Sequence, residues 1–326
     1  MSALVYLPLL VPVLAAAAAR PLAARLEPRL ATWLLTATTV ALAAFSTAAL
    51  ALMTASALAR SPLLAALGDY SQPALRRGDP VPALAGMAAA LLLTAAAVAV
   101  AVVIRARARA LAESYRRAAS MAPGGRVVVM PGHSIEAYAL PGSPGRIVVS
   151  GRLLDALNDR GRAALLAHEH AHLAGRHHLF TTVAHLAAAA NPLLLPVARA
   201  VDYTVERWAD ERAAAITGDR RLVASTIGQV ALLATPRRPG RLRATALGIT
   251  GARGAARGVP GSRGRPISLA WAGPVPRRVA ALLAPPPRRQ LALLAIVAIL
   301  ILIAGASAAV AARDLHALLE FAQAAR

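Results

Sequence analysis

The sequence predicts an α-helical membrane protein with about four transmembrane helices and a polar, mainly α, α+β domain between the third and the fourth. The membrane assignment rests on composition: 57% of the 326 residues are hydrophobic. The mean hydropathy of +0.55 is too high for an ordinary soluble domain of this length. The polar domain is predicted because residues 105–288 carry short strand-like and helix-like patterns between two apolar stretches.

The charge of the chain limits the classes of partner that it is expected to bind. All 36 basic residues are arginine, and the formal net charge is +21. So positive a chain is expected to bind either nucleic acid or anionic lipid headgroups, and the hydrophobicity favours lipid. We therefore expect a lipid bilayer as partner and no nucleic acid. The absence of cysteine excludes a disulfide framework, a thiolate metal site and a cysteine nucleophile.

Four apolar stretches are candidates for membrane spans, because about 20 apolar residues cross the hydrocarbon core. The first is short and contains Pro8 and Pro12. It lacks the basic start and the clean cleavage site of a signal peptide, so we expect it to be a retained span. The four stretches are residues 3–19, 31–59, 81–104 and 291–312.

The arginines predict how the spans are oriented. They are dense between the first and second spans, after the third and before the fourth, and such sides tend to face the cytoplasm. Both chain ends then face outward, in a multi-pass protein of the cell membrane. The predicted domains are a membrane domain with three helices (1–104), a cytoplasmic domain (105–288), and the fourth helix with a short tail (289–326).

The polar segment begins with three β-rich runs separated by Pro-Gly turns, which predict a small sheet. These runs are 126–130 (RVVVM), 137–140 (AYAL) and 146–150 (RIVVS). An Arg/Gly/Pro-rich stretch over 235–265 buries little and is expected to be a flexible loop.

Two helices are predicted between the sheet and that loop. The first begins near Asn158 or Asp159, which are good N-caps, and ends at Gly175. The second covers 196–217 and is closed by Gly218.

The first of these helices carries an unusual concentration of imidazoles. Residues 165–178, LLAHEHAHLAGRHH, contain five of the eight histidines. His168 and His172 are four residues apart, so their rings project from one helix face and can bind one metal ion. Glu169 lies beside them, where it can reach metal-bound water without being a ligand. This is the H-E-x-x-H spacing, in which two neutral imidazoles bind zinc and the glutamate is a general base.

A catalytic zinc usually has three protein ligands and an open position for water. The second predicted helix contains VERWADERAA, in which Glu206 and Asp210 lie one turn apart. Ala209 and Ala213 give this helix a small face that permits close packing. The third ligand is therefore expected from this segment.

HEHAH followed by ERWAD resembles the HExxH…ExxAD motif pair of the membrane gluzincin metallopeptidases. These include HtpX-type, CaaX-prenyl-protease-type and BlaR/MecR-type enzymes. The resemblance implies a zincin metallopeptidase domain in which His168, His172 and Glu206 bind one Zn²⁺ per chain. It makes Glu169 the general base, and Asp210 a residue that orients a ligand histidine without binding the ion.

The resemblance covers about residues 126–287, from the strands before the zinc helix to PVPRRVAALLAPP. Three spans before the metal domain, one after it and a short interval between the motifs favour a BlaR/MecR-like protein. No sensor domain follows the fourth span, so β-lactam sensing is not expected. The interval 181–201 is apolar but interrupted by polar residues and prolines, which predicts a buried or interfacial helical hairpin. His177 occupies a position where many relatives carry Asp.

The implied function is zinc-dependent hydrolysis of peptide bonds in membrane-associated or cytosolic proteins, with a transcriptional repressor as one candidate substrate. Zinc would activate water and polarise the scissile carbonyl, while Glu169 moves the proton. The strand 137–140 is expected to bind substrate as an added strand. Tyr203, His133 and an arginine are all candidates for stabilising the oxyanion.

Other functions stay open at this stage. The chain could be a catalytically inactive zinc-binding sensor or scaffold, an HtpX-like quality-control protease, or a metal handler in the membrane. Transport would favour ionisable ligands inside spans two to four, which contain none. An inactive relative usually loses its base, whereas Glu169 is present.

The remaining polar residues have structural interpretations. We expect His170, His177 and His178 at the surface or at a helix end, and His185 as a core or interfacial residue. Glu206 could instead form a surface pair with a neighbouring arginine. The arginine runs beside the spans, Arg277 and Arg278 among them, are assigned to topology and lipid contact.

Overall fold

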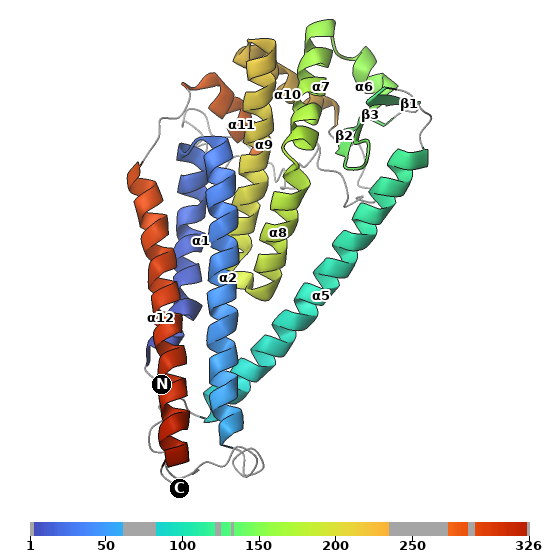
Figure 1. Cartoon of the computed structure of the whole chain (residues 1–326). Helices are drawn as coiled ribbons and strands as arrows, with labels where there is room; N and C mark the ends of the chain where they lie inside the picture. The colour runs from blue at the N-terminus through green and yellow to red at the C-terminus, as the bar shows by residue number, and fades with distance from the viewer. Residues whose placement is uncertain are drawn as a thin grey trace, which may run out of the picture.

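The computed structural model describes residues 3–60, 83–120, 125–131, 134–234, 273–285 and 291–324. Figure 1 shows a bundle of long helices, with a small sheet and several shorter helices at one end and both chain termini toward the other. Four helices are long and apolar enough to cross a membrane. The predicted fold class is therefore confirmed.

The four long helices are α1 (Leu7–Arg25, after a 3-10 turn at Ala3–Tyr6), α2 (Pro28–Ala59), α5 (Ala83–Ser120) and α12 (Leu291–Ala324). The α1–α2 turn is short because Glu27 caps α2, its carboxylate accepting the backbone N–H groups of Arg29 and Leu30.

Helix α5 does not end at the predicted limit of the third span. It continues past Ile104 to Ser120 without a break. The arginines that follow Ile104 end the apolar stretch but are good helix formers, so the helix persists beyond the charge boundary. The proposed domain boundary at 104/105 thus falls inside one helix, which leans away from the rest of the bundle in Figure 1.

The sheet has the three predicted strands: β1 (Val127–Met130), β2 (Ala137–Leu140) and β3 (Arg146–Ser150). Their order is β1-β3-β2, with β3 parallel to β1 and antiparallel to β2. The short helix α6 (Gly151–Asp155) follows. Strand β2 is at the edge of the sheet and packs beside the helix that carries the HEHAH motif.

The remaining helices are α7 (Asp159–Ala174), α8 (His177–Ala190), α9 (Leu195–Thr217, after a 3-10 turn at Pro192–Leu194), α10 (Arg220–Leu233) and α11 (Pro274–Leu283). The expected caps are present. The Asn158 side chain accepts the backbone N–H of Gly161 at 2.8 Å. Gly218 ends α9 with φ of 69°, a left-handed conformation that costs glycine little.

Helices α8 and α9 form a hairpin, as the interrupted interval predicts, and it packs against α1 and α2. The hydroxyls of Thr32 and Thr204 lie 3.0 Å apart, and Asn191 Nδ2 donates to Ser46 Oγ at 3.0 Å. At 1.5 Å per residue, Ser46 lies about 27 Å from the start of α2. The hairpin therefore shares one core with the candidate spans.

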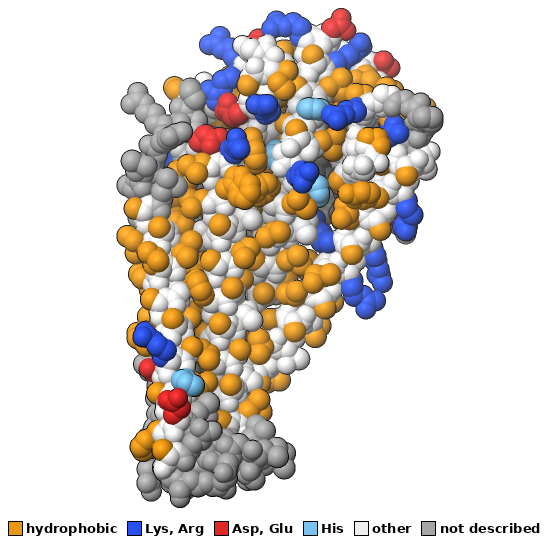
Figure 2. Space-filling model, viewed as in Figure 1, with side chains coloured by type: hydrophobic (Ala, Val, Ile, Leu, Met, Phe, Trp, Pro, Cys, Tyr) orange, Lys and Arg blue, Asp and Glu red, His pale blue; other side chains and the backbone are white. Residues whose placement is uncertain are grey.

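The surface has two parts in Figure 2. Hydrophobic side chains cover the length of the bundle, whereas most charged side chains gather at the end that carries α7, α10 and the sheet. An apolar belt below a charged cap is the pattern of a protein that spans a bilayer. The predicted flexible loop, 235–265, lies outside the described residues.

Candidate metal centre

The site forms where α7 crosses α9. Small buried residues line this contact, among them Ala164 and Ala167 on α7 and Ala209 and Ala213 on α9. Their size lets the two helices approach closely, as was predicted for the α9 side. The motif histidines consequently face the acidic residues of α9 across a short gap.

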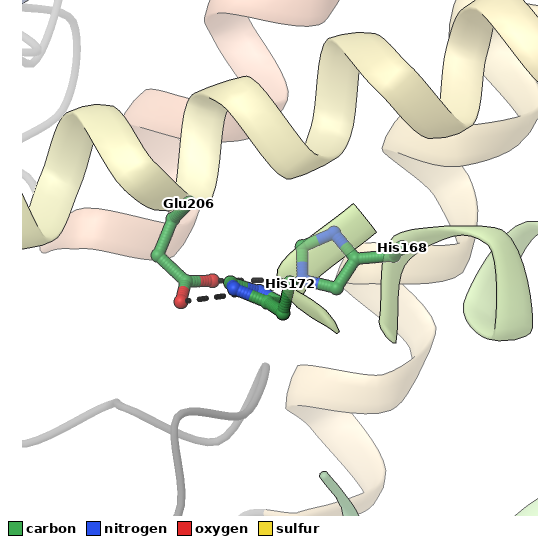
Figure 3. A group of neighbouring side chains, drawn as sticks. All are labelled: His168, His172 and Glu206. Atoms are coloured by element: carbon green, nitrogen blue, oxygen red, sulfur yellow. Dashed lines mark hydrogen bonds and ion pairs between the residues drawn. The ribbon is translucent and has the colours of Figure 1, made fainter. Parts of the chain in front are cut away.

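His168, His172 and Glu206 converge (Figure 3), and their potential ligand atoms all lie within 4.8 Å of one another. The two Nε2 atoms are 3.1 Å apart. Glu206 Oε2 is 3.7 Å from His168 Nε2, and Glu206 Oε1 is 3.7 Å from His172 Nε2. The structure thus brings together the three residues that the sequence proposed as ligands.

This geometry fits a zinc ion. Tetrahedral zinc with bonds of about 2.0–2.1 Å would place its ligand atoms about 3.3 Å from one another. The observed separations of 3.1, 3.7 and 3.7 Å lie on either side of that value. Two imidazoles and a carboxylate are also a donor set that zinc prefers.

Asp210 and an arginine support the His168 side. Asp210 Oδ1 lies 3.0 Å from His168 Nδ1, on the ring edge opposite the ligand atom. Arg278 on α11 donates to both Asp210 oxygens, at 2.7 and 2.6 Å, and its Nη1 lies 2.7 Å from Glu206 Oε2. All four residues are buried or nearly so. Asp210 therefore contacts a candidate ligand histidine on the edge away from the ligand atom, and its orienting role stays a prediction.

The assignment of Arg278 to topology and lipid contact was wrong. Arg278 is buried and ion-paired inside the site, because two adjacent buried carboxylates need a cation to remain ionised. Its neighbour Arg277 lies over the Tyr203 ring, with its guanidinium carbon 4.2 Å from the ring centroid. The resemblance of PVPRRVAALLAPP to the peptidases was the feature that could have identified Arg278.

A third histidine supports His172. His177 is fully buried, and its Nδ1 lies 3.0 Å from His172 Nδ1. Its ring also packs on Trp208, with centroids 4.6 Å apart. His177 was expected at the surface or at a helix end. It does lie at a helix end, but the expected exposure was wrong. It is the first residue of α8, but that end of α8 is buried between α7 and Trp208 of α9.

The turn between α7 and α8 makes this contact possible. Arg176 adopts a left-handed conformation with φ of 48°, whereas Gly175 keeps a right-handed conformation with φ of −80°. A Cβ atom on Gly175 would lie 2.3 Å from His177 Nε2. Gly175 thus ends the helix where predicted, and the structural requirement for glycine is space for the His177 ring.

The contacts define the ring tautomers of a metal-binding site. If His172 Nε2 binds a metal, that atom is unprotonated, and Nδ1 carries the ring proton and donates it to His177 Nδ1. His177 then carries its own proton on Nε2, a buried atom with no hydrogen-bond partner among the described residues. An imidazole therefore takes the accepting role that a carboxylate plays beside His168.

The two candidate ligand histidines differ in pKa. Burial lowers the pKa of His168, but hydrogen bonds with Asp210 and Glu206 outweigh it and raise the pKa to about 9. Burial also lowers the pKa of His172, to about 3, with only partial opposition from Glu206. Burial raises the pKa of Glu206, but Arg278 and His172 reverse this and hold it well below its usual range.

Glu169 lies beside this cluster and is completely buried. The backbone N–H of Ala139 on β2 lies close enough to stabilise the Glu169 carboxylate, which has no side-chain hydrogen-bond partner within the described part of the chain. Burial raises the pKa of Glu169 to about 7, against the opposing effect of His168. A carboxylate with free lone pairs and a pKa near neutrality can accept a proton and return it.

The other polar candidates lie outside this cluster or outside the described residues. His170 is exposed, with Nε2 3.3 Å from Arg126 Nη1, and His178 is half-buried. His185 pairs with Asp202, which agrees with the interfacial role expected of it. His133 lies outside the described residues.

Residues 99–188 match the sequence model of Peptidase family M48. No match was found among curated proteins or among solved structures. The matched segment includes β1–β3 and the HEHAH motif, and it ends before Glu206, Asp210 and Arg278. Together with four apolar helices, the match fits a membrane-embedded zincin metallopeptidase of the HtpX/BlaR type.

Proposed function

We propose that this chain is an integral membrane zinc endopeptidase in which His168, His172 and Glu206 bind one zinc ion and Glu169 is the general base. The M48 match indicates a metallopeptidase of a zinc-dependent family. The observation that carries the residue assignment is the convergence of three donor atoms beside a fully buried carboxylate that no described side chain hydrogen-bonds.

The reaction assigned to this site is hydrolysis of a peptide bond. A bound zinc ion would supply Lewis-acid polarisation of the scissile carbonyl and a lowered pKa for water. Glu169 accepts a proton from the attacking water while the water oxygen forms a bond to the carbonyl carbon. Glu169 then delivers that proton to the amide nitrogen as the C–N bond breaks. Asp210 and His177 hold the two imidazoles in the orientation that keeps both Nε2 atoms available.

The free edge of β2 is the proposed place for the substrate. In the described sheet, β2 pairs with β3 alone, and the strand packs near α7. An extended peptide could add to this edge as a further strand and so lie along the helix that carries Glu169. Main-chain pairing of this kind would align a peptide bond without requiring a particular sequence.

The proposed substrates are membrane-associated or cytosolic proteins. The site lies at the charged end of the bundle in Figure 2, away from both termini in Figure 1. The arginines flanking the spans favour a cytoplasmic position for this end. Regulatory cleavage of a repressor and HtpX-like quality control are both compatible with a site at that position.

The direct test compares detergent-purified wild type with Glu169→Gln on casein and a peptide library. The substitution keeps the side-chain shape but removes the proton acceptor, so we expect a rate loss of about 10²–10⁴-fold with zinc retained. His170→Gln is the matched control, because His170 is exposed on the same motif, and it should cleave at the wild-type rate. Equal cleavage by Glu169→Gln and wild type would reject Glu169 as the base.

The same pair of proteins separates an enzyme from an inactive zinc-binding scaffold. If proteolysis is the function, Glu169→Gln should fail to complement a deletion strain although it folds and binds zinc. Full complementation by Glu169→Gln, with no cleavage by zinc-loaded wild type, would reject the peptidase function and support a zinc-binding scaffold.

A further inference from the structure

A polar stripe descends the α8–α9 hairpin from the candidate metal centre. On α9, Arg199, Asp202 and Glu206 recur every three or four residues and so lie on one helix face. On α8, His185 contacts Asp202, and Thr182 lies one turn before His185 on the same helix face. We call Thr182, His185, Arg199 and Asp202 the polar seam. At 1.5 Å per residue, the distance along α9 from Arg199 in the seam to Glu206 at the metal centre is about 10 Å.

The seam is more open than the centre above it. His185 Nε2 lies 2.9 and 3.2 Å from the two carboxylate oxygens of Asp202, and their side chains are 25% and 43% exposed. One turn higher, Glu206 is 17% exposed, whereas His168 is 1% exposed. Accessibility therefore decreases stepwise along one face toward the metal ligands, and the seam is continuous with the site.

The seam lies at membrane depth. Asp202 is close in sequence to Thr204, which contacts Thr32 one turn from the start of α2. Asn191, at the tip of the hairpin, contacts Ser46 deeper in the same span. The seam therefore lies at the level of the first turns of a span that contains no ionisable residue between 31 and 59. A partly exposed carboxylate–imidazole pair at this depth is costly in hydrocarbon, and such polar groups occur where water or polar ligands enter.

We propose that the polar seam is a substrate subsite that binds the unwound, membrane-embedded end of a membrane-anchored substrate, next to its scissile bond. A helix that unwinds inside a bilayer exposes backbone N–H and C=O groups, which need hydrogen-bond partners there. The Asp202 carboxylate accepts from backbone N–H groups, and Arg199 and the Thr182 hydroxyl donate to carbonyl oxygens. The β2 edge then binds the part of the substrate outside the membrane.

This inference rests on the proposed peptidase function and narrows its substrate class. It assigns substrates whose cleavage site lies within a few residues of a transmembrane segment. A pair that merely held α8 against α9 would affect all substrates alike, since loosening the hairpin would disturb Glu206 itself. Substrate selectivity therefore distinguishes the two roles.

The test uses one casein-derived cleavage sequence in three forms, with the enzyme in lipid nanodiscs. The sequence is placed directly beside a transmembrane helix, separated from that helix by a flexible linker of about 20 residues, or supplied as a soluble peptide. The variants are His185→Ala and Asp202→Asn. The matched control is His316→Ala, because His316 and Glu320 form an exposed pair on α12, with the contact atoms 3.2 Å apart.

For the directly anchored substrate, kcat/KM should fall about tenfold or more in both seam variants. The linked and soluble substrates should change less than about twofold, with zinc content unaltered. Equal losses on all three substrates, or no loss on the anchored one, would overturn the subsite. If Asp202→Asn does not fold, His185→Gln and Thr182→Val carry the same comparison. A wild type that cleaves none of the substrates rejects the peptidase itself, whereas soluble cleavage without selective loss rejects the seam alone.

Discussion

The two histidines of the HEHAH motif lie on one helix, are equally buried, and are supported in opposite ways. His168 contacts the carboxylate of Asp210, which Arg278 holds in place. His172 contacts the imidazole of His177, which packs on Trp208. The pKa of His168 is raised to about 9, and that of His172 is lowered to about 3.

The difference shows that a metal-binding motif determines the ligand atoms but not their protonation. Both imidazoles must be neutral to bind zinc. His172 is already neutral at physiological pH, whereas His168 must lose a proton that Asp210 and Glu206 stabilise. The partners responsible come from α8, α9 and α11, all outside the motif.

The largest effect is expected on removing the cation from the His168 side. In Arg278→Leu, Asp210 and Glu206 lose their buried partner, and we expect a loss of about 3–5 kcal/mol in the free energy of unfolding of the metal-free protein. Thermal unfolding in detergent measures this. Arg277→Leu is the control and should cost about 1 kcal/mol or less, because it loses mainly a ring contact. Similar melting temperatures for Arg278→Leu and Arg277→Leu would contradict a structural role for the ion pairs of Arg278.

Weakening the carboxylate support should lower zinc affinity. Asp210→Asn keeps the side-chain size but removes the charge opposite His168, and we expect zinc affinity to fall about 10–100-fold. Competition with a fluorescent chelator measures it. Glu211→Gln removes the same charge one residue further along and should bind zinc as wild type does. Unchanged affinity in Asp210→Asn would show that His168 needs no carboxylate.

A carboxylate next to each of His168 and His172 should remove the difference in how the two rings are supported. His177→Asp places a carboxylate next to His172 Nδ1, and we expect zinc affinity to rise about 3–10-fold because the ligand becomes more basic. His178→Asp adds the same charge one residue later and serves as control. Weaker zinc binding in His177→Asp would mean that the imidazole, packed on Trp208, positions His172 better than a carboxylate does.

The smallest effect is a difference of about one proton. At pH 8, His168 is protonated in the metal-free protein, because its pKa of about 9 lies above that pH. Zinc binding should therefore release about one proton more from wild type than from Asp210→Asn, in which the pKa of His168 falls. Calorimetry in buffers of different ionisation enthalpy counts these protons. Equal release from both proteins would place the proton elsewhere.

Local patterns explain why much of the fold could be predicted. Asn158 and Gly218 cap helices as their chemistry dictates, and the three β-rich runs form the three strands. The i, i+4 spacing of His168 and His172 and the adjacent acidic motif led to a cluster that the structure brings together. The caps, the strands and the histidine pair depend on residues close in sequence, whereas Glu206, 34 residues after His172, was identified by the resemblance of ERWAD to a family motif.

The missed features depend on long-range packing. Arg278 is one of 36 arginines and pairs with residues about 70 positions away, so composition could not single it out. The burial of His177 depends on the break between α7 and α8 at Gly175–Arg176 and on packing against Trp208 of α9, which the sequence alone does not specify. The depth of the α8–α9 hairpin likewise depends on contacts with α2.

The zinc dissociation constants of Glu206→Gln and Glu169→Gln, measured side by side with wild type, test the central assignment most directly. If Glu206 is the third ligand and Glu169 is the base, Glu206→Gln should bind zinc more than about 100-fold more weakly, beyond the effect of a supporting residue. Glu169→Gln should stay within about threefold of wild type. Wild-type affinity in Glu206→Gln, or an equal loss in Glu169→Gln, would contradict the assignment of ligand and base.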